Sequence, residues 1–165
     1  MTRAVLSIGA NLGDRLANLR IAVTGLSEFL EAVSPVYETA PWGVTDQPDF
    51  LNAVLIVRDP TADAWAWLHR AQALEQQAGR IRDRRWGPRT LDVDIVTVDG
   101  VTSDHPDLLL PHPGTPTRAT VLIPWLAIAP EAELPTHGPI ADLLAALPPE
   151  DHQAVRPRPD LVLRP

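Results

Sequence analysis

Apolar residues gather along the first hundred positions of this chain in short stretches that predict four strands. The stretches at 4–8 and 51–57 are rich in Ala, Val, Leu and Ile, which is typical of strands buried in a core. Two further stretches, at 33–39 and 91–98, have the same character. Pro35 interrupts the second strand, and proline lacks the N–H that a central strand needs. This strand is therefore expected at a sheet edge or at a bulge.

Two segments between these strands carry apolar residues at helical spacing. The first helix follows Asp14, whose carboxylate suits an N-cap. Its apolar face is expected to contain Leu16, Leu19, Val23, Leu26 and Leu30. The second helix is expected to begin at Thr61 or Asp63 and to end near Ala78, with Gly79 as its C-cap.

The chain beyond residue 100 is richer in proline and less regular. Loops are predicted over 104–116, a helix over 117–127 and a short helix over 139–147, followed by an irregular tail over 148–165. The order β-α-β-β-α-β, followed by helices, predicts an α+β fold of the ferredoxin-like type, in which helices pack on an antiparallel sheet. With no internal repeat and no linker, residues 1–165 are expected to form a single domain.

Length and charge limit the possible partners. The 165 residues (18.0 kDa) contain no apolar run near the roughly 20 residues that a membrane span requires. The first residues lack a signal-peptide cleavage pattern, so a cytoplasmic protein without a membrane partner is expected. A net charge of −7 argues against a general nucleic-acid-binding surface. Small-molecule substrates are the remaining expectation. The protein is also expected to be a monomer.

Two residue types are missing, and each excludes a class of chemistry. The absence of cysteine excludes disulfides, thiol nucleophiles and sulfur-ligated metals. The chain also has no lysine, since all 14 basic residues are arginine. Schiff-base catalysis and a P-loop lysine are therefore excluded. Any bound phosphate must be bound by arginine.

Asp92 and Asp94 form the sharpest local feature. Side chains alternate along a strand, so both carboxylates are expected on one face, with Val93 on the other. Two such oxygen donors suit one or two Mg²⁺ ions shared with substrate phosphates. The pattern by itself also fits a solvated strand face that carries two acids.

An arginine-rich segment precedes this pair. It contains Arg80, Arg82, Arg84, Arg85 and Arg89, interrupted by Trp86. Guanidinium groups bind phosphate oxygens in a bidentate manner, so the segment can hold a polyphosphate. A basic loop paired with nearby acids and a small RNA-binding patch are the alternatives. Carboxylates for Mg²⁺ beside arginines for phosphate are the recurring parts of phosphoryl-transfer sites.

Two other motifs bear on phosphate binding. Gly9-Ala-Asn-Leu-Gly13 lies between a strand and a helix, but its spacing matches neither the dinucleotide fingerprint nor the P-loop, so it is interpreted as a turn. His112 lies between two prolines, and with Arg118 it can supply further donors to phosphates.

Taken together, these residues resemble the 6-hydroxymethyl-7,8-dihydropterin pyrophosphokinase family of folate biosynthesis. The resemblance extends from Ser7 to about Pro130. It is carried by Ser7–Gly13, Gln47–Ala53, Gly79–Arg82, Arg85–Ile95, and Leu110–His112 with Arg118. The stretch Arg-Trp-Gly-Pro-Arg-Thr-Leu-Asp-Val-Asp-Ile is highly specific for this family.

The resemblance implies transfer of the terminal pyrophosphoryl group of MgATP to the pterin hydroxymethyl group, with release of AMP. It implies that Asp92 and Asp94 hold two Mg²⁺ ions. The arginines that neutralise developing charge are Arg80, Arg82 and Arg89. The residues implied for ATP binding are Gln72, Glu75, Arg82, Trp86, Ile95, His112 and Arg118. Those implied for pterin binding are Thr39, Ala40, Trp42, Phe50 and Asn52. The loops at 40–49 and 79–90 are implied to close over the substrates and exclude water.

Two other function classes stay open at this point. Nucleotidyl transfer also uses paired aspartates and Mg²⁺, but it releases pyrophosphate rather than AMP. An RNA-binding module on a ferredoxin-like sheet would need exposed aromatic residues, and the chain has only two Phe and one Tyr.

Overall fold

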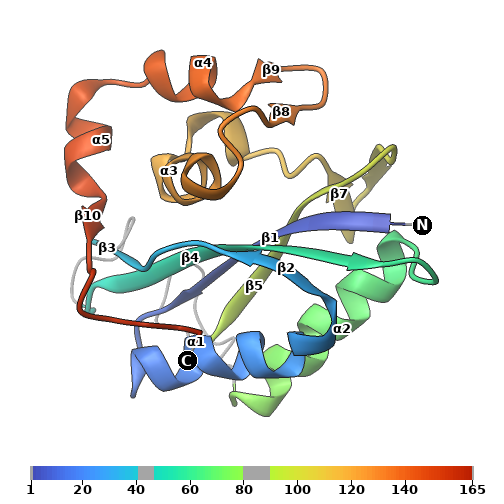
Figure 1. The fold of residues 1–165 in the computed structure, drawn as a ribbon, viewed down its shortest axis with the longest axis horizontal. Helices are drawn as coiled ribbons and strands as arrows, with labels where there is room; N and C mark the ends of the chain where they lie inside the picture. Colours follow the sequence, from blue (N-terminus) through green and yellow to red (C-terminus); the bar gives the residue numbers. More distant parts are fainter. Residues whose placement is uncertain (1, 41–46, 80–89, 165) are drawn as a thin grey trace.

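The computed structural model describes residues 2–40, 47–79 and 90–164, and a six-stranded antiparallel sheet lies at its centre (Figure 1). The strands of this sheet are β1 (Thr2–Ala10), β2 (Leu30–Val33), β3 (Tyr37–Thr39), β4 (Phe50–Asp59), β5 (Asp92–Val98) and β10 (Arg156–Pro157). Their order is β10-β3-β4-β1-β5, and β2 pairs with β4. Because β1 occupies one side of β4 from Leu51 to Asp59, β2 and β3 follow one another along the other side. This order confirms the expected ferredoxin-like arrangement.

The predicted interruption of the second strand is observed at Ser34. The Ser34 N–H donates to the Val54 carbonyl (2.9 Å), while the Ser34 hydroxyl accepts from the Val54 N–H (2.8 Å). At this break a buried side-chain hydroxyl thus takes the place of a backbone carbonyl as the acceptor for the Val54 N–H. As a result β2 and β3 stay aligned on β4 although the strand between them is broken.

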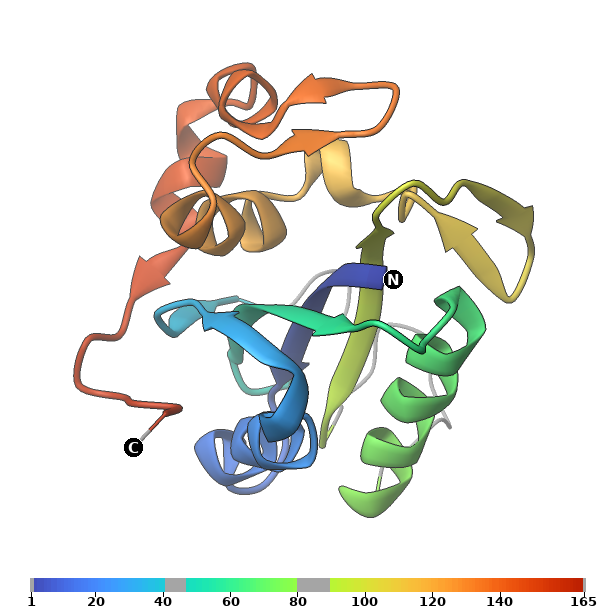
Figure 2. The ribbon, with the colours of Figure 1, turned by 45° about the vertical axis from the view of Figure 1, so that its right-hand side comes forward.

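Helices cover both faces of the sheet. α1 (Arg15–Gly25) and α2 (Ala64–Gln77) lie on one face, and α3 (Ala119–Ile128), α4 (Ile140–Ala145) and α5 (Pro149–Ala154) lie on the other (Figures 1 and 2). The predicted N-caps are confirmed, since Asp14 accepts from the Ala17 N–H (3.0 Å) and Asp63 from the Ala66 N–H (2.8 Å). Gly79, with φ of +70°, follows the Ala78 C-cap of α2.

Each face of the sheet has its own apolar core. Ile8, Leu55 and Val93 pack with α1 and α2 around the fully buried Trp67. On the other face, Val5, Val54 and Val96 pack under α3 and α4. The strand residues alternate between the two cores, as the period of two requires, except at a register shift in the β1–β5 ladder that puts Ile95 and Val98 in the same core.

Several smaller elements complete the described chain. They are η1 (Ser27–Phe29), β6 (Ser103–His105), β7 (Leu108–Leu110), η2 (Thr115–Thr117), β8 (Glu133–Leu134) and β9 (Gly138–Pro139). The helices predicted over 117–127 and 139–147 correspond to α3 and α4. None of the helices in the described ranges combines the length and the apolar character that a bilayer crossing requires.

Three sequence-based expectations were wrong. Leu30 does not continue the first helix, because α1 ends at Gly25 and Leu30 begins β2. The proline-rich region 104–116 contains part of a β6–β7 hairpin, whose Leu108 and Leu110 are buried. The tail over 148–165 is not irregular, since α5 and β10 lie within it.

Candidate active site

Near the C-terminal end of β1, three paired residues form a row across the strands β4, β1 and β5. Gly9 pairs with Asn52 of β4 on one side and with Asp92 of β5 on the other. Paired positions on adjacent antiparallel strands share a face, and neighbouring strands lie about 4.8 Å apart. Asn52 and Asp92 are therefore about 10 Å apart on one face, separated by a residue without a side chain.

The chemistry of this face changes along the strands. Val5, Val54 and Val96 belong to the core beneath α3. Toward the Gly9 row the same face carries Ser7 and Asp94, which pair with each other and are half-buried. The apolar surface needed for packing against α3 thus gives way to polar side chains beyond it, which marks this end of the sheet as the candidate site.

Asp92 and Asp94 lie on this face, as the strand alternation predicted. Val93 and Ile95 between and beyond them are buried in the core on the α1–α2 face. Both carboxylates are half-buried. The prediction of a same-face pair is therefore confirmed in position.

Glu75 of α2 supports the backbone between the two aspartates. Its Oε2 accepts a hydrogen bond from the Val93 N–H (2.9 Å), and the residue is only 3% exposed. Among the described strands, β5 has a neighbour only on its β1 side, and this N–H donates to Glu75 rather than to a strand. A buried carboxylate from α2 supplies the missing acceptor and fixes the strand where the aspartates emerge.

The donor set at this position fits Mg²⁺ rather than a fully protein-ligated metal. Within residues 2–40, 47–79 and 90–164, no group of three or more His, Asp or Glu side chains forms a metal cluster. Mg²⁺ is usually held by one or two carboxylates, with phosphate oxygens and water completing its octahedron. Asp92 and Asp94 match that requirement.

His112 reaches this end of the sheet from the segment before α3. The backbone N–H of His112 donates to the Val96 carbonyl (2.9 Å), and this bond attaches the segment to β5. Its Nδ1 accepts from the Gly114 N–H (3.2 Å). Burial and the charge of Arg118 lower the pKa of His112. The charge of Asp92 raises it, but the net effect is a lowered pKa. The ring is therefore neutral near pH 7, with Nε2 as the N–H donor.

Arg118, at the N-cap of α3, crosses over Gly114. A Cβ at Gly114 would lie 2.6 Å from the guanidinium carbon of Arg118. A side chain at position 114 would make the Arg118 guanidinium shift, so its present direction depends on the glycine.

On the other side of Gly9, Asn52 is oriented by Thr39. The Asn52 Nδ2 donates to the Thr39 Oγ1 (2.9 Å), and Thr39 pairs with Phe50. Thr39 is buried, whereas Asn52 and Phe50 are half-buried and Ala40 is exposed. Three of the residues implied for pterin binding thus lie together on β3 and β4, and a fourth, Ala40, directly follows β3.

The other implied residues are distributed as follows. Gln72 is exposed on α2. Ile95 faces the α1–α2 core, so only its backbone can contribute to a site on the aspartate face. The remaining implied residues, Trp42, Arg80, Arg82, Trp86 and Arg89, lie outside the described residues.

Sequence reasoning missed a set of supporting residues. Asn11, treated only as part of a turn, is 1% exposed and donates to the Gln47 Oε1 (2.7 Å) and the Pro48 carbonyl (3.0 Å). These bonds fix the segment that leads into Phe50. Their only signal in the sequence was that both partners lie in the stretches that carry the family resemblance.

Known proteins similar to this chain are pyrophosphokinases. A family model described as 7,8-dihydro-6-hydroxymethylpterin-pyrophosphokinase (HPPK) matches residues 5–130. A 2-amino-4-hydroxy-6-hydroxymethyldihydropteridine pyrophosphokinase of Mycobacterium tuberculosis is 51% identical over 168 residues, covering 94% of this chain and 89% of that protein. A protein of the same description from Pseudomonas aeruginosa is 38% identical over 150 residues, covering 88% and 92%.

A solved structure described as HPPK-DHPS in complex with substrates superposes with a TM-score of 0.68 at 15% identity. The match covers 88% of this chain but only 43% of that longer chain. At this identity the likeness concerns the fold, which it supports independently of sequence.

Proposed function

The chain belongs to the 7,8-dihydro-6-hydroxymethylpterin-pyrophosphokinase family, and from this membership we propose how its residues divide the work of the reaction. The enzyme transfers a pyrophosphoryl group from ATP to the hydroxymethyl group of 6-hydroxymethyl-7,8-dihydropterin, a step of folate biosynthesis. AMP is the second product. The hydroxymethyl oxygen forms a bond to the β-phosphorus, the bond from that phosphorus to the α–β bridging oxygen breaks, and the hydroxyl proton is lost.

One observation carries the assignment of residues: the row Asn52–Gly9–Asp92. It supports a pterin on the β3–β4 side and ATP phosphates on the β5 side, with Gly9 between them. Because Gly9 has no side chain, substrates bound on either side can meet directly above it. Holding two reactants in reacting distance is a large part of what such a site contributes.

On the phosphate side, Asp92 and Asp94 would hold two Mg²⁺ ions. When bound, these ions neutralise the charge of the phosphate oxygens. Glu75 keeps the β5 backbone fixed beneath the aspartates, and Ile95 would contribute through its backbone. Neutral His112 would donate a hydrogen bond from Nε2, and Arg118 a charge-assisted one. Arg80, Arg82 and Arg89 keep their proposed role toward developing charge; they lie outside the described residues.

On the pterin side, the proposed contacts are stacking and edge recognition. Phe50 would stack on the fused ring, as aromatic side chains do with nucleobases. Asn52 would hydrogen-bond to the ring edge, and Thr39 would hold the Asn52 amide in the required orientation. Ala40 would border the ring.

The same enzyme is proposed to act as a single-domain monomer. The described elements share two cores on one sheet, which supports one folding unit. Light scattering after size-exclusion chromatography should then give a mass near 18.0 kDa. A mass of twice that value would overturn the monomer.

The direct test follows the nucleotide product. The protein is incubated with ATP, Mg²⁺ and the reduced pterin, and AMP and free pyrophosphate are measured together. AMP formed in equal amount with diphosphorylated pterin is the expected result, and it should require both Mg²⁺ and the pterin. Release of free pyrophosphate with a nucleotidylated product would instead indicate nucleotidyl transfer.

A further inference from the structure

The C-terminal segment 155–164, here called the C-terminal strap, runs from α5 along the outer edge of β3 and on to α1 (Figures 1 and 2). Its β10 pairs with β3. The backbone N–H of Arg158 donates to the Val36 carbonyl (2.9 Å). From α1, the Arg20 Nη2 donates to the Val162 carbonyl (2.6 Å). The strap is therefore attached along its length to the sheet and to α1.

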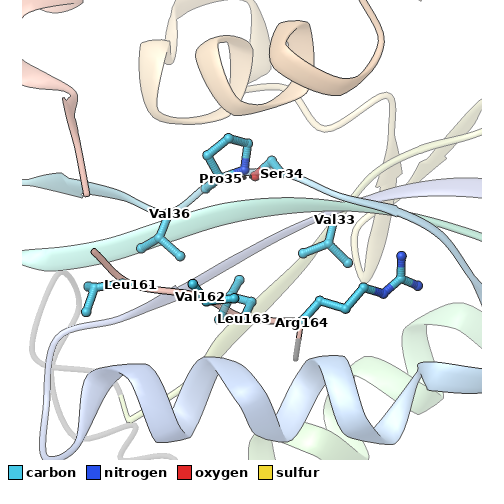
Figure 3. Close-up of a pocket in the computed structure, with 8 residues that line it drawn as sticks. All are labelled: Val33, Ser34, Pro35, Val36, Leu161, Val162, Leu163 and Arg164. Atoms are coloured by element: carbon cyan, nitrogen blue, oxygen red, sulfur yellow. Dashed lines mark hydrogen bonds between the residues drawn. The ribbon is translucent and has the colours of Figure 1, made fainter. Parts of the chain in front are cut away.

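The end of the strap also packs against the link between β2 and β3. Figure 3 shows residues 161–164 facing residues 33–36 across a cavity of about 250 Å³. Val36 and Leu163, from opposite walls, are both buried in the core on the α1 side. Apolar packing holds the strap in place independently of its charges.

Two arginines of the strap reach the chain immediately before the proposed pterin residues. The Arg158 Nη1 donates to the Glu38 Oε1 (2.8 Å), and Glu38 is the neighbour of Thr39. The Arg156 Nη2 donates to the Asp49 Oδ2 (2.6 Å), and Asp49 is the neighbour of Phe50. The strap thus contacts β3 and the residue directly before β4, in each case one residue away from a proposed pterin contact.

Arg15 joins these two points from α1. Its Nη1 donates to the other oxygen of Glu38 and also to the Asp49 carbonyl (3.0 Å). Glu38, whose side chain is 13% exposed, therefore lies between two guanidinium groups. Burial raises the pKa of Glu38, but the hydrogen bonds from Arg15 and Arg158 outweigh this and leave the pKa below its ordinary value. The carboxylate is charged at neutral pH.

β3 needs such support because it is short. It spans only Tyr37–Thr39, and its ladder to β4 ends at the pair Thr39–Phe50. A three-residue strand that lies between β4 and the two-residue β10 has few backbone bonds, and segments with few such bonds open more easily than long central strands. Side-chain bonds to Glu38 therefore have a large share in fixing where Thr39 lies, and through Thr39 where the Asn52 amide points.

We propose that Arg158 is a positioning residue for pterin binding: through Glu38 it holds β3, and with it the Thr39–Asn52 pair, in the orientation that receives the pterin. This inference rests on the proposed function. Arg158 does not touch the substrates; it acts from the side of the sheet opposite to the Gly9 row, because Glu38 alternates with Tyr37 and Thr39.

The test compares Arg158→Ala with Arg158→Lys in steady-state kinetics of AMP formation. Arg158→Ala should raise the KM for the pterin roughly tenfold, with kcat and the KM for ATP within about twofold of the wild type. Arg158→Lys keeps one donor to Glu38 and should recover most of the loss. Glu38→Gln, which keeps the shape of the side chain, should resemble Arg158→Ala.

Arg3→Ala is the matched control. It removes an ion pair of similar geometry, Arg3 with Glu31 (2.8 Å), at a partly exposed position away from the Gly9 row. Its KM for the pterin should stay at the wild-type value. An equal rise in the two alanine variants would mean that loss of an ion pair acts through general destabilisation, and an unchanged KM in Arg158→Ala would overturn the proposal.

Amide hydrogen exchange gives a readout that does not depend on activity. Arg158→Ala should speed exchange of the β3 and Phe50 amides relative to those of β1, whereas Arg3→Ala should not. If the wild type forms no AMP, the proposed function fails, and the exchange result still reports whether Arg158 fixes β3. If exchange at β3 is unchanged in Arg158→Ala, the positioning role fails even when the wild type is active.

Discussion

Gly9 lies so close to Asn52 that a Cβ on the glycine would stand 3.1 Å from the Asn52 Oδ1 and 3.7 Å from a ring carbon of Phe50. Its φ is not in the left-handed region, so the backbone itself would accept alanine. What glycine provides here is space on the face of the sheet, beside the Asn52 and Phe50 side chains. This space lies between the proposed pterin and phosphate sides of the site.

Gly9→Ala should therefore weaken pterin binding without unfolding the protein. The new methyl group pushes the Asn52 amide away from its place beside Thr39, at a cost of about 1–2 kcal/mol, or roughly tenfold in the KM for the pterin. Steady-state kinetics with each substrate varied in turn would show this. A larger rise in the KM for ATP than for the pterin would contradict the assignment of the two sides.

Gly114→Ala should affect the KM for ATP rather than the KM for the pterin. A Cβ at this position would displace the Arg118 guanidinium, which lies 2.6 Å from where that atom would be. If Arg118 binds ATP phosphates, the KM for ATP should rise roughly tenfold, as expected for a lost charge-assisted hydrogen bond. The KM for the pterin should change little. Each glycine variant thus serves as the control for the other.

Asp92→Asn and Asp94→Asn should each lower AMP formation at least about 100-fold, since an amide replaces a proposed charged metal ligand. Asp99→Asn, at an exposed turn position just beyond β5, is the matched control and should retain activity. Circular dichroism and thermal melting would verify that the folds agree. Turnover near the wild-type rate in either site variant would refute the metal assignment.

Glu75 can be tested by separating its hydrogen bond from its charge. Glu75→Gln keeps an oxygen that can accept from the Val93 N–H, while Glu75→Ala leaves that buried donor without its partner, at a cost of about 1–3 kcal/mol in unfolding free energy. If Glu75 acts by holding β5, the glutamine variant should retain much more activity than the alanine variant. Equal losses would indicate that the charge of Glu75 acts directly in ATP binding.

The stability contributed by Glu38 should depend on pH. Its pKa is lowered in the folded protein, so its contribution is fully present above the ordinary value of 4.5 and is lost as the pH falls through the folded pKa. Glu38→Gln should be about 1 kcal/mol less stable than the wild type at neutral pH. Urea unfolding midpoints of the two proteins should approach one another on acidification. The exposed Glu28→Gln is the control, and it should follow the wild type throughout.

The parts of the fold that local sequence determines were predicted well. β1, β4 and α2 follow from apolar runs and from the cap at Asp63, because such signals depend on residues within a few positions of one another. The same-face aspartates follow from strand alternation alone. Leu30 was misassigned because its apolar side chain fits either a helix face or a strand, and only the end of α1 at Gly25 decides between them.

The parts that depend on distant contacts were not predictable. The proline-rich tail has no strong local preference for helix or strand. Nevertheless, Arg158 hydrogen-bonds to Glu38, 120 positions earlier in the chain, and β10 pairs with β3. Glu75 was assigned to ATP by resemblance, and its bond to Val93 depends on how α2 packs on β5. The meeting of Asn52, Gly9 and Asp92 is set by the register of three strands, which no single stretch of sequence contains.

The pairing of β10 with β3 has a consequence for how molecules of this protein meet one another. An uncovered outer strand presents donors and acceptors to which a second chain can add, and proteins commonly hide such edges. Here β10 covers the outer side of β3. At the opposite side of the sheet, on β5, the Val93 N–H already donates to Glu75. A protein cut before Val155 would expose β3 to other molecules. It should therefore self-associate as its concentration rises, even where its catalytic side chains are intact.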